Sequence, residues 1–200
     1  VKSLEYVNVG EGQMTGKNEM NSADTKSVII LAAGKGSRLK SSLPKVFHKI
    51  GGLSLLDHVI KTAEEIFADE ISVVLSPEYI NYKSEISNRI LIACQENHTG
   101  TGDTVKHGLE KLSSKESGWV YVLYGDVPLV SSDSLNAMYE IANQHKNTAV
   151  VVLAFDSSDS KDLGRLELAD TSETIKRIVE AKDISEKDNT IPLCNAGLLI

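Results

Sequence analysis

A glycine-rich loop directly follows an apolar run near the start of the chain. Residues 28–39 read VIILAAGKGSRL, so a strand-forming run leads into Gly34, Gly36 and Arg38. Glycines let backbone N–H groups converge on phosphate oxygens, and a guanidinium can bind phosphate through two parallel hydrogen bonds. Lys45 follows in LPKV, where the preceding proline stiffens the backbone beside an ammonium that can reach a phosphate. The pattern indicates a phosphate-binding loop.

Two familiar nucleotide loops do not fit these residues. A dinucleotide fingerprint, G-x-G-x-x-G, requires a glycine where Leu39 stands. The Walker A pattern, G-x-x-x-x-G-K-[ST], does not occur in the loop either. A surface loop with incidental basic residues is the alternative to a phosphate site.

A carboxylate stands at the end of another apolar run. Residues 119–130 read WVYVLYGDVPLV, so a strand-like segment delivers Asp126 behind a glycine. At the carboxyl end of a strand, a carboxylate can face a phosphate pocket and bind Mg²⁺, which prefers oxygen ligands. The alternative is an aspartate that only forms a turn.

A third segment, residues 95–105, combines an amide with a glycine-rich turn in QENHTGTGDTV. The side chain of Gln95 and the backbone at Gly100 can pair with the donors and acceptors on the edge of a base. Taken alone, the glycines would more simply begin a helix.

Five short runs rich in Val, Ile and Tyr are typical of buried strands. They cover residues 27–33, 71–75, 89–93, 119–124 and 149–155. Helical patterns lie between or beside them, at 53–69, 77–88, 101–112 and 131–145. Alternating strands and helices predict an α/β fold with a doubly wound, mostly parallel mixed sheet.

Local signals refine this prediction at two places. Ser54 followed three residues later by Asp57 is typical of a capping box at a helix start. Beyond residue 155 the chain has short strand-like segments without long helices, which predicts an antiparallel portion of the sheet. Residues 1–26 lack periodicity and are predicted to form a flexible N-terminal tail, with the domain over 27–200.

Composition limits the classes of function. The formal net charge of −7 argues against a nucleic-acid partner, which usually requires a basic patch. No apolar run approaches the roughly 20 residues of a membrane-spanning helix, so no membrane partner is expected. Cys94 and Cys194 sit in apolar stretches, which favours reduced thiols in a cytoplasmic protein over a disulfide.

The first loop carries a family resemblance. LAAGKGSRLKSSLPKVFHKIGG resembles the signature L-A-A-G-x-G-[TS]-R…P-K of sugar-nucleotide and related nucleotidyltransferases. The resemblance implies a Rossmann-like, GT-A-like nucleotidyltransferase domain in which this loop wraps a nucleotide triphosphate. It also implies that Arg38 and Lys45 neutralise phosphate charge, with Lys45 on the reacting α-phosphate. The implied nucleotide-binding residues of the loop are Leu31, Ala32, Ala33 and Gly34.

Residues 95–105 narrow the family, because they resemble the Q-x-x-x-x-G-T-G segment of bacterial N-acetylglucosamine-1-phosphate uridyltransferases. This implies that Gln95, Gly100 and Thr101 contact the uracil nucleotide. Asp103 departs from the family, which usually carries a histidine there. In the second apolar run, the resemblance implies that Asp126 holds a catalytic Mg²⁺ and that Tyr124 and Gly125 lie beside the nucleotide.

Three later segments match the family in order. LGRLEL resembles Y-G-R-I, IVEAKD resembles I-V-E-x-K-D, and CNAGLLI resembles I-N-T-G-I. The resemblance implies that Gly164, Glu180 and Asn195 bind the sugar, through a backbone amide, a carboxylate and a side-chain amide.

The implied reaction transfers UMP from UTP to N-acetylglucosamine 1-phosphate, with Mg²⁺ as cofactor, in the synthesis of UDP-N-acetylglucosamine for peptidoglycan and the cell wall. Self-association is left open. In the family, a second metal ligand, the closing strands and an acetyltransferase β-helix come later than residue 200. We therefore expect the domain to lack its C-terminal part, and acetyl transfer is not implied. The alternatives are a different nucleotidyltransferase, such as a cytidylyl- or molybdopterin-nucleotide enzyme, or a non-catalytic nucleotide-binding module.

Overall fold

The computed structural model describes most of the chain. The described residues are 4–9, 25–34, 36, 39–97, 100–113, 118–144, 148–157, 163–169, 174–186 and 188–200. They form two compact units, one of Met20–Leu135 and one of Val1–Glu19 with Asn136–Ile200. We call these the 20–135 unit and the 136–200 unit. Within the described ranges, no helix has the length and apolar character to cross a membrane.

A parallel sheet forms the centre of the 20–135 unit. Its strands are β2 (Lys26–Leu31), β5 (Glu70–Leu75), β6 (Leu91–Cys94) and β7 (Trp119–Tyr124). They lie in the order β7-β2-β5-β6, and all three pairings are parallel. Every residue of β2 after Lys26 is buried, as expected for a sheet covered on both faces. The predicted α/β fold with a parallel core is confirmed.

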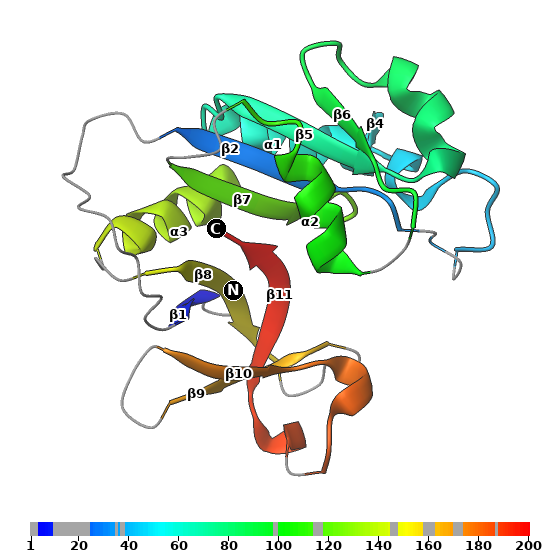
Figure 1. Cartoon of the computed structure of the whole chain (residues 1–200). Helices are drawn as coiled ribbons and strands as arrows, with labels where there is room; N and C mark the ends of the chain where they lie inside the picture. The colour runs from blue at the N-terminus through cyan, green and yellow to red at the C-terminus, as the bar shows by residue number, and fades with distance from the viewer. Residues whose placement is uncertain are drawn as a thin grey trace. The chain divides into compact units, whose positions relative to one another are not determined.

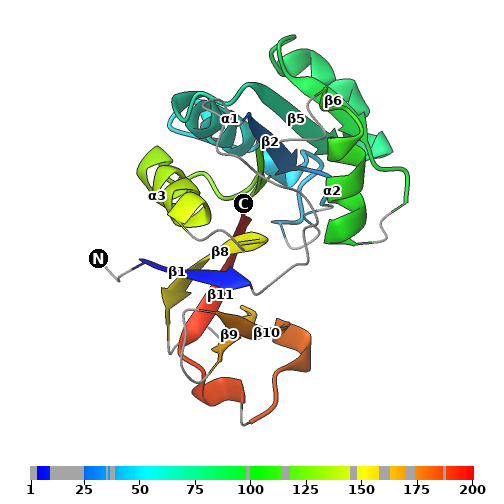
Figure 2. The ribbon, with the colours of Figure 1, turned by 60° about the vertical axis from the view of Figure 1, so that its left-hand side comes forward.

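Two helices cover opposite faces of this sheet, as Figure 1 and Figure 2 show: α1 (Leu55–Glu65) and α2 (Thr101–Leu109). The predicted capping box is present, since the Ser54 hydroxyl accepts from the Asp57 N–H and the Asp57 carboxylate accepts from the Ser54 N–H. These two bonds satisfy backbone donors that the first turn of α1 leaves unpaired. They set where α1 begins.

Short elements complete this unit. They are η2 (Lys45–Phe47), the hairpin of β3 (Lys49–Ile50) and β4 (Leu53–Ser54), and η3 (Pro77–Glu85). The helical segment predicted at 77–88 is a 3₁₀ helix. None of its residues is fully buried, so no apolar stripe stabilises an α-helix. Its Tyr82 ring stacks on Phe47 at 4.7 Å between centroids, which ties η3 to η2.

Antiparallel strands dominate the 136–200 unit, as predicted. They are β1 (Leu4–Val9), β8 (Val150–Asp156), β9 (Arg165–Leu168), β10 (Ile175–Val179) and β11 (Leu193–Leu199). β8 pairs with both β1 and β11, and β9 pairs with β10 and β11. The unit also contains the turns η4 (Ala181–Asp183) and η5 (Asp188–Thr190), and most of α3 (Ser132–Gln144), which continues from the 20–135 unit.

The segment predicted as a flexible tail contains one of these strands. Residues 4–9 form β1, and Lys26 already belongs to β2. The sequence LEYVNV contains strand-forming residues. The prediction overlooked them because the residues that follow are polar and contain glycine. For the remainder of residues 1–26 the flexible tail stays a prediction.

The packing of α2 on β2 gives a test of the core. An added Cβ at Gly108 would stand 2.5 Å from Cγ2 of the fully buried Ile29. Overpacking costs about 1 to 3 kcal/mol, against a gain of up to about 1 kcal/mol in helix propensity. We therefore expect Gly108→Ala to lower the free energy of unfolding in urea. Gly102→Ala, on the same helix but with no atom within 4 Å of the added Cβ, should raise it instead. Equal effects of the two substitutions would contradict the packing.

Candidate active site

A cavity of about 630 Å³ opens at the carboxyl ends of the parallel strands in the 20–135 unit. This edge of an open α/β sheet is where ligands usually bind. Its lining residues are Leu31, Ala32, Ala33, Gly34, Gly36, Leu39, Lys45, Val46, Gln95, Gly100, Thr101, Thr104, Tyr124 and Asp126. The structure thus brings together side chains from three separate sequence motifs.

The first residues after β2 are held by the neighbouring strands on both sides. The Ala32 N–H donates to the Val74 carbonyl at 2.9 Å, and the Gly125 N–H donates to the Leu31 carbonyl at 3.0 Å. Ala33, like Leu31 and Ala32, is almost fully buried. These three residues can therefore meet a ligand mainly through their backbone, whereas Gly34 is exposed.

Gly36 lies in close contact with Lys45, nine positions later in the chain. Its φ of +57° favours glycine, and an added Cβ would stand 2.7 Å from Cβ of Lys45. The backbone of Lys45 is itself anchored, since the following Val46 and Phe47 are buried, each 4% exposed. Glycine at position 36 therefore lets the loop close onto the lysine.

Lys45 and Asp126 form an ion pair at the cavity wall, between Nζ and Oδ2. The two residues are 81 positions apart in the chain. Their side chains are 40% and 26% exposed, so solvent still reaches both charges. Asp126 follows β7, and Gly125 between it and Tyr124 is buried, with an added Cβ only 3.3 Å from the Leu31 carbonyl oxygen.

Asp126 could bind Mg²⁺ as a single protein ligand, with substrate phosphates and water as the other ligands. Among the residues of the described ranges, no three His, Cys, Asp or Glu side chains gather as a metal-binding group. Proteins often bind Mg²⁺ through one or two carboxylates together with substrate phosphates and water, so a single carboxylate at the wall of an open cavity suits this mode. The donor set therefore fits a metal that arrives with a nucleotide.

Gln95 occupies the other end of the cavity in a hydrogen-bond network. Its Nε2 donates to Oδ2 of Asp103 at 2.9 Å and to the Gly100 carbonyl at 3.4 Å, and its Oε1 accepts from the Thr104 hydroxyl at 2.9 Å. The backbone of Gln95 continues the parallel pairing, since its N–H donates to the Leu75 carbonyl. Gly100 precedes α2 with a φ of +120°, a conformation that side chains rarely adopt.

The three residues predicted to bind a sugar come together in the 136–200 unit. The Asn195 N–H donates to the Gly164 carbonyl at 2.9 Å. An added Cβ at Gly164 would stand 3.8 Å from Cα of Glu180 and 3.9 Å from Cβ of Asn195. Glu180 is exposed, and Oδ1 of Asn195 accepts from the Gly197 N–H at 2.8 Å. Residues separated by some thirty positions thus meet at one place.

A buried layer supports this group from the adjacent positions. Arg165, next to Gly164, is 2% exposed, and its Nη1 donates to the Ser157 carbonyl at 3.1 Å and to Sγ of Cys194. Cys194 pairs with Arg165 between β11 and β9. Both cysteines of the chain, Cys94 and Cys194, are unbonded to each other in the structure, and their reduced state stays a prediction.

The turn between Glu180 and Asn195 is held by Asp188. Its carboxylate accepts from the Ser185 hydroxyl and N–H and from the Arg177 guanidinium, and these bonds lower the pKa of Asp188 to about 2 from an ordinary 3.8. A lowered pKa in the folded state means that the carboxylate stabilises the fold above pH 3.8, and that this contribution disappears as the pH falls through about 2.

We expect Asp188→Asn to lower the free energy of unfolding at pH 7, with a difference from the wild type that shrinks between about pH 5 and pH 2. Urea unfolding at four pH values measures this difference. Asp183→Asn, at an exposed position of the same unit, is the control and should change little. A pH-independent loss in Asp188→Asn would show that the carboxylate charge is not responsible.

Some predicted residues line the cavity and others do not. Leu31, Ala32, Ala33, Gly34, Lys45, Gln95, Gly100, Thr101, Tyr124 and Asp126 all line it. Arg38 lies outside the described residues. The prediction missed Leu39, Val46 and Thr104, which also line the cavity, and it named Gly36 in the motif only. Thr104, one helical turn after Gly100, could have been found from that spacing.

A family comparison agrees with this geometry. The model of the family described as "MobA-like NTP transferase domain" matches residues 28–183. These residues contain the whole cavity lining. The chain belongs to this family. The glycine-rich loop after β2 and the ion pair of Lys45 with Asp126 both lie within the matched residues.

Curated relatives and solved structures extend the comparison. The chain is 36% identical over 173 residues to the bifunctional protein GlmU of Sphingopyxis alaskensis, covering 86% of this chain and 38% of that protein. It is 38% identical over 172 residues to GlmU of Parvibaculum lavamentivorans, covering 84% and 37%. A Bacillus anthracis structure, provisionally assigned as a glucose-1-phosphate thymidylyltransferase, superposes with a TM-score of 0.68 at 16% identity, covering 88% and 70%. The chain thus spans less than two fifths of the GlmU relatives, and the solved structure supports the fold.

Proposed function

We propose that the chain transfers UMP from UTP to N-acetylglucosamine 1-phosphate, giving UDP-N-acetylglucosamine and pyrophosphate. The observation that carries this proposal is the joining of Lys45, Asp126 and Gln95 in one cavity of about 630 Å³. The first two supply opposite charges for phosphate and metal, and the third supplies an amide for a base. Homology with the GlmU proteins favours this pair of substrates.

The chemical step is an in-line displacement. A phosphate oxygen of N-acetylglucosamine 1-phosphate forms a bond to the α-phosphorus of UTP, the bond to the β-phosphate oxygen breaks, and pyrophosphate leaves with the electron pair. The attacking oxygen is already anionic, so the step needs no general base. Catalysis then consists of positioning and charge neutralisation.

Lys45 and Asp126 change partners when substrate binds. The Lys45 ammonium moves from the Asp126 carboxylate to oxygens of the α-phosphate, where it stabilises charge in the transition state. Asp126 is then available to hold Mg²⁺. When bound, this metal neutralises charge on the triphosphate and orients it. Arg38 adds a bidentate contact to the phosphates in this proposal.

The acceptor sugar is assigned to the group in the 136–200 unit. Gly164, Glu180 and Asn195 are adjacent and supply backbone, carboxylate and amide groups. A carboxylate accepts hydrogen bonds from sugar hydroxyls, and an amide can donate to a carbonyl such as that of an N-acetyl group. We place the reaction in the cytoplasm, in the synthesis of a sugar nucleotide for the cell wall.

A pyrophosphate-release screen tests the proposal. UTP, CTP, ATP and GTP are each combined with Mg²⁺ and with N-acetylglucosamine 1-phosphate, glucose 1-phosphate or a phosphorylated small alcohol. The expected result is the highest kcat/KM for UTP with N-acetylglucosamine 1-phosphate. Preference for another pair would assign a different nucleotidyltransferase, and calorimetric binding of UTP without turnover on any acceptor would indicate a non-catalytic nucleotide-binding module.

A further inference from the structure

The amide of Gln95 is held between neighbours of different hydrogen-bonding type. Oδ2 of Asp103 lies 2.9 Å from one end and the Thr104 hydroxyl lies 2.9 Å from the other. A carboxylate can only accept, so the amide atom that faces Asp103 has to be the nitrogen. Gln95 is 2% exposed, so water cannot compensate if the amide turns over.

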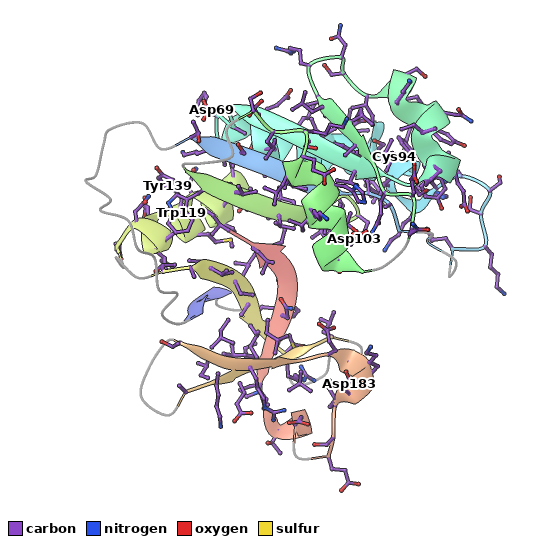
Figure 3. The ribbon with its side chains drawn as sticks, in the orientation of Figure 1. Asp69, Cys94, Asp103, Trp119, Tyr139 and Asp183 are labelled. Carbon is purple, nitrogen blue, oxygen red and sulfur yellow. The ribbon has the colours of Figure 1, made fainter. Side chains whose placement is uncertain are left out.

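Asp103 and Thr104 face different cavities. Thr104 lines the main cavity, whereas Asp103 lines a second cavity of about 370 Å³ with Cys94, Glu96, Asn97 and His107. Figure 3 shows Asp103 on α2 and Cys94 at the end of β6. The nitrogen of the amide is therefore bonded to Asp103 of the second cavity and to the carbonyl of Gly100, which lines the main one. The oxygen is bonded to Thr104 of the main cavity.

We propose that Asp103 is a positioning residue that orients the Gln95 amide, so that its oxygen faces the base and the site selects uracil over cytosine. The inference rests on the proposed nucleotide transfer and deepens it, because it assigns the specificity of that site to a residue behind the base-contacting one. Asp103 itself does not take part in the chemical step.

The hydrogen bonds determine what the amide can offer to a base. Its two N–H groups point to Asp103 and to the carbonyl of Gly100. Its oxygen has two acceptor sites, and the Thr104 hydroxyl uses one of them. That hydroxyl also lies 3.0 Å from the Gly100 carbonyl, but this carbonyl already accepts from the Thr104 N–H at 3.2 Å. The remaining capacity of the amide is therefore as an acceptor.

Uracil and cytosine differ at the atom that such an acceptor reads. N3 of uracil carries a hydrogen and donates, whereas N3 of cytosine is an acceptor. An amide oxygen matches the first and opposes the second. If the amide turned over, its oxygen would meet the Asp103 carboxylate at 2.9 Å, and two acceptors at that distance repel each other. The carboxylate thus prevents the orientation that would accept cytosine.

Asp103→Asn tests this role without changing the size of the side chain. An asparagine can either donate or accept, so both orientations of Gln95 become available. We expect the ratio of kcat/KM for UTP over CTP to fall about tenfold, through a higher KM for UTP at an almost unchanged kcat. An unchanged ratio, or a fall in kcat alone, would overturn the proposal.

Glu96→Gln is the matched control. It removes the same charge from an exposed position of the second cavity. The UTP over CTP ratio should stay at the wild-type value. If both variants lowered the ratio equally, local charge rather than amide orientation would be the cause, and the proposal would be wrong.

NMR of the ligand-free chain separates this inference from the proposed function. The Gln95 side-chain NH₂ signals, assigned by their loss in Gln95→Met, should show one hydrogen shifted downfield and protected from exchange. Asp103→Asn should weaken both effects, because the amide then adopts both orientations. Identical spectra of the wild type and Asp103→Asn would overturn the inference even if the enzyme is active. A screen without nucleotide turnover or binding would instead reject the proposed function, and the NMR result would still decide the orientation.

Discussion

Replacing Lys45 with alanine should lower kcat for nucleotide transfer about a hundredfold or more, because it removes a positive charge that the transition state needs. The loss should be larger in kcat than in KM for UTP, because in the proposed mechanism the ammonium stabilises charge that develops on the α-phosphate in the transition state. Steady-state pyrophosphate release with saturating acceptor measures both constants.

The fold should survive this change. The pair that Lys45 forms with Asp126 is 40% and 26% exposed, and such half-exposed pairs stabilise proteins by about 0 to 1 kcal/mol. Urea unfolding of Lys45→Ala should therefore stay within about 1 kcal/mol of the wild type. Lys49→Ala, at an exposed position of β3, is the matched control and should keep full turnover. Wild-type turnover in Lys45→Ala would disprove the assigned role.

Replacing Asp126 with asparagine should have an effect of similar size but of a different form. The side chain keeps its shape and loses its charge, so Mg²⁺ is held less well, and turnover should fall by roughly a hundredfold or more. The Mg²⁺ concentration for half-maximal rate should rise at the same time. A titration of rate against Mg²⁺ at fixed UTP measures both changes.

The same variant should bind UTP more tightly when Mg²⁺ is left out. The negative charge beside the triphosphate is gone, and Lys45 has lost the carboxylate that competes with phosphate for its ammonium. Calorimetry in the presence of a chelator measures this affinity. Asp133→Asn, an exposed position in the first turn of α3, should leave both binding and rate unchanged. If Asp126→Asn weakened metal-free UTP binding, the ion pair could not be the competitor for the nucleotide.

The fold was predictable where one local pattern dominates. The apolar runs of β2, β5 and β7 are strands, and Ser54 and Asp57 begin α1 as their spacing predicted. The prediction was wrong where a strand depends on a partner that is distant in the sequence. Residues 4–9 pair with β8, which is some 140 positions away, and no short window contains that information. Residues 77–85 begin with a proline, as helices often do, but none of their side chains is buried. They therefore form a 3₁₀ helix and not the predicted α-helix.

The candidate site shows the same division. Glycine spacing and the position of Asp126 after a strand identified, from sequence, residues that line one cavity. The ion pair between Lys45 and Asp126 could not be predicted, because it depends on β2 and β7 being neighbours in the sheet. The contact between Gln95 and Asp103 was also missed, since no local sequence pattern indicates that a side chain of the first turn of α2 reaches the amide.

The close approach of Gly36 to Lys45 has a consequence for engineering the nucleotide site. With 2.7 Å between an added Cβ and the lysine Cβ, any side chain at position 36 forces residue 36 or residue 45 to shift. A library that randomises the loop to change nucleotide preference would therefore recover variants with a misplaced lysine, and would score them as losses of specificity. Productive diversity in this site has to come from positions such as the exposed Leu39, which lines the cavity without that contact.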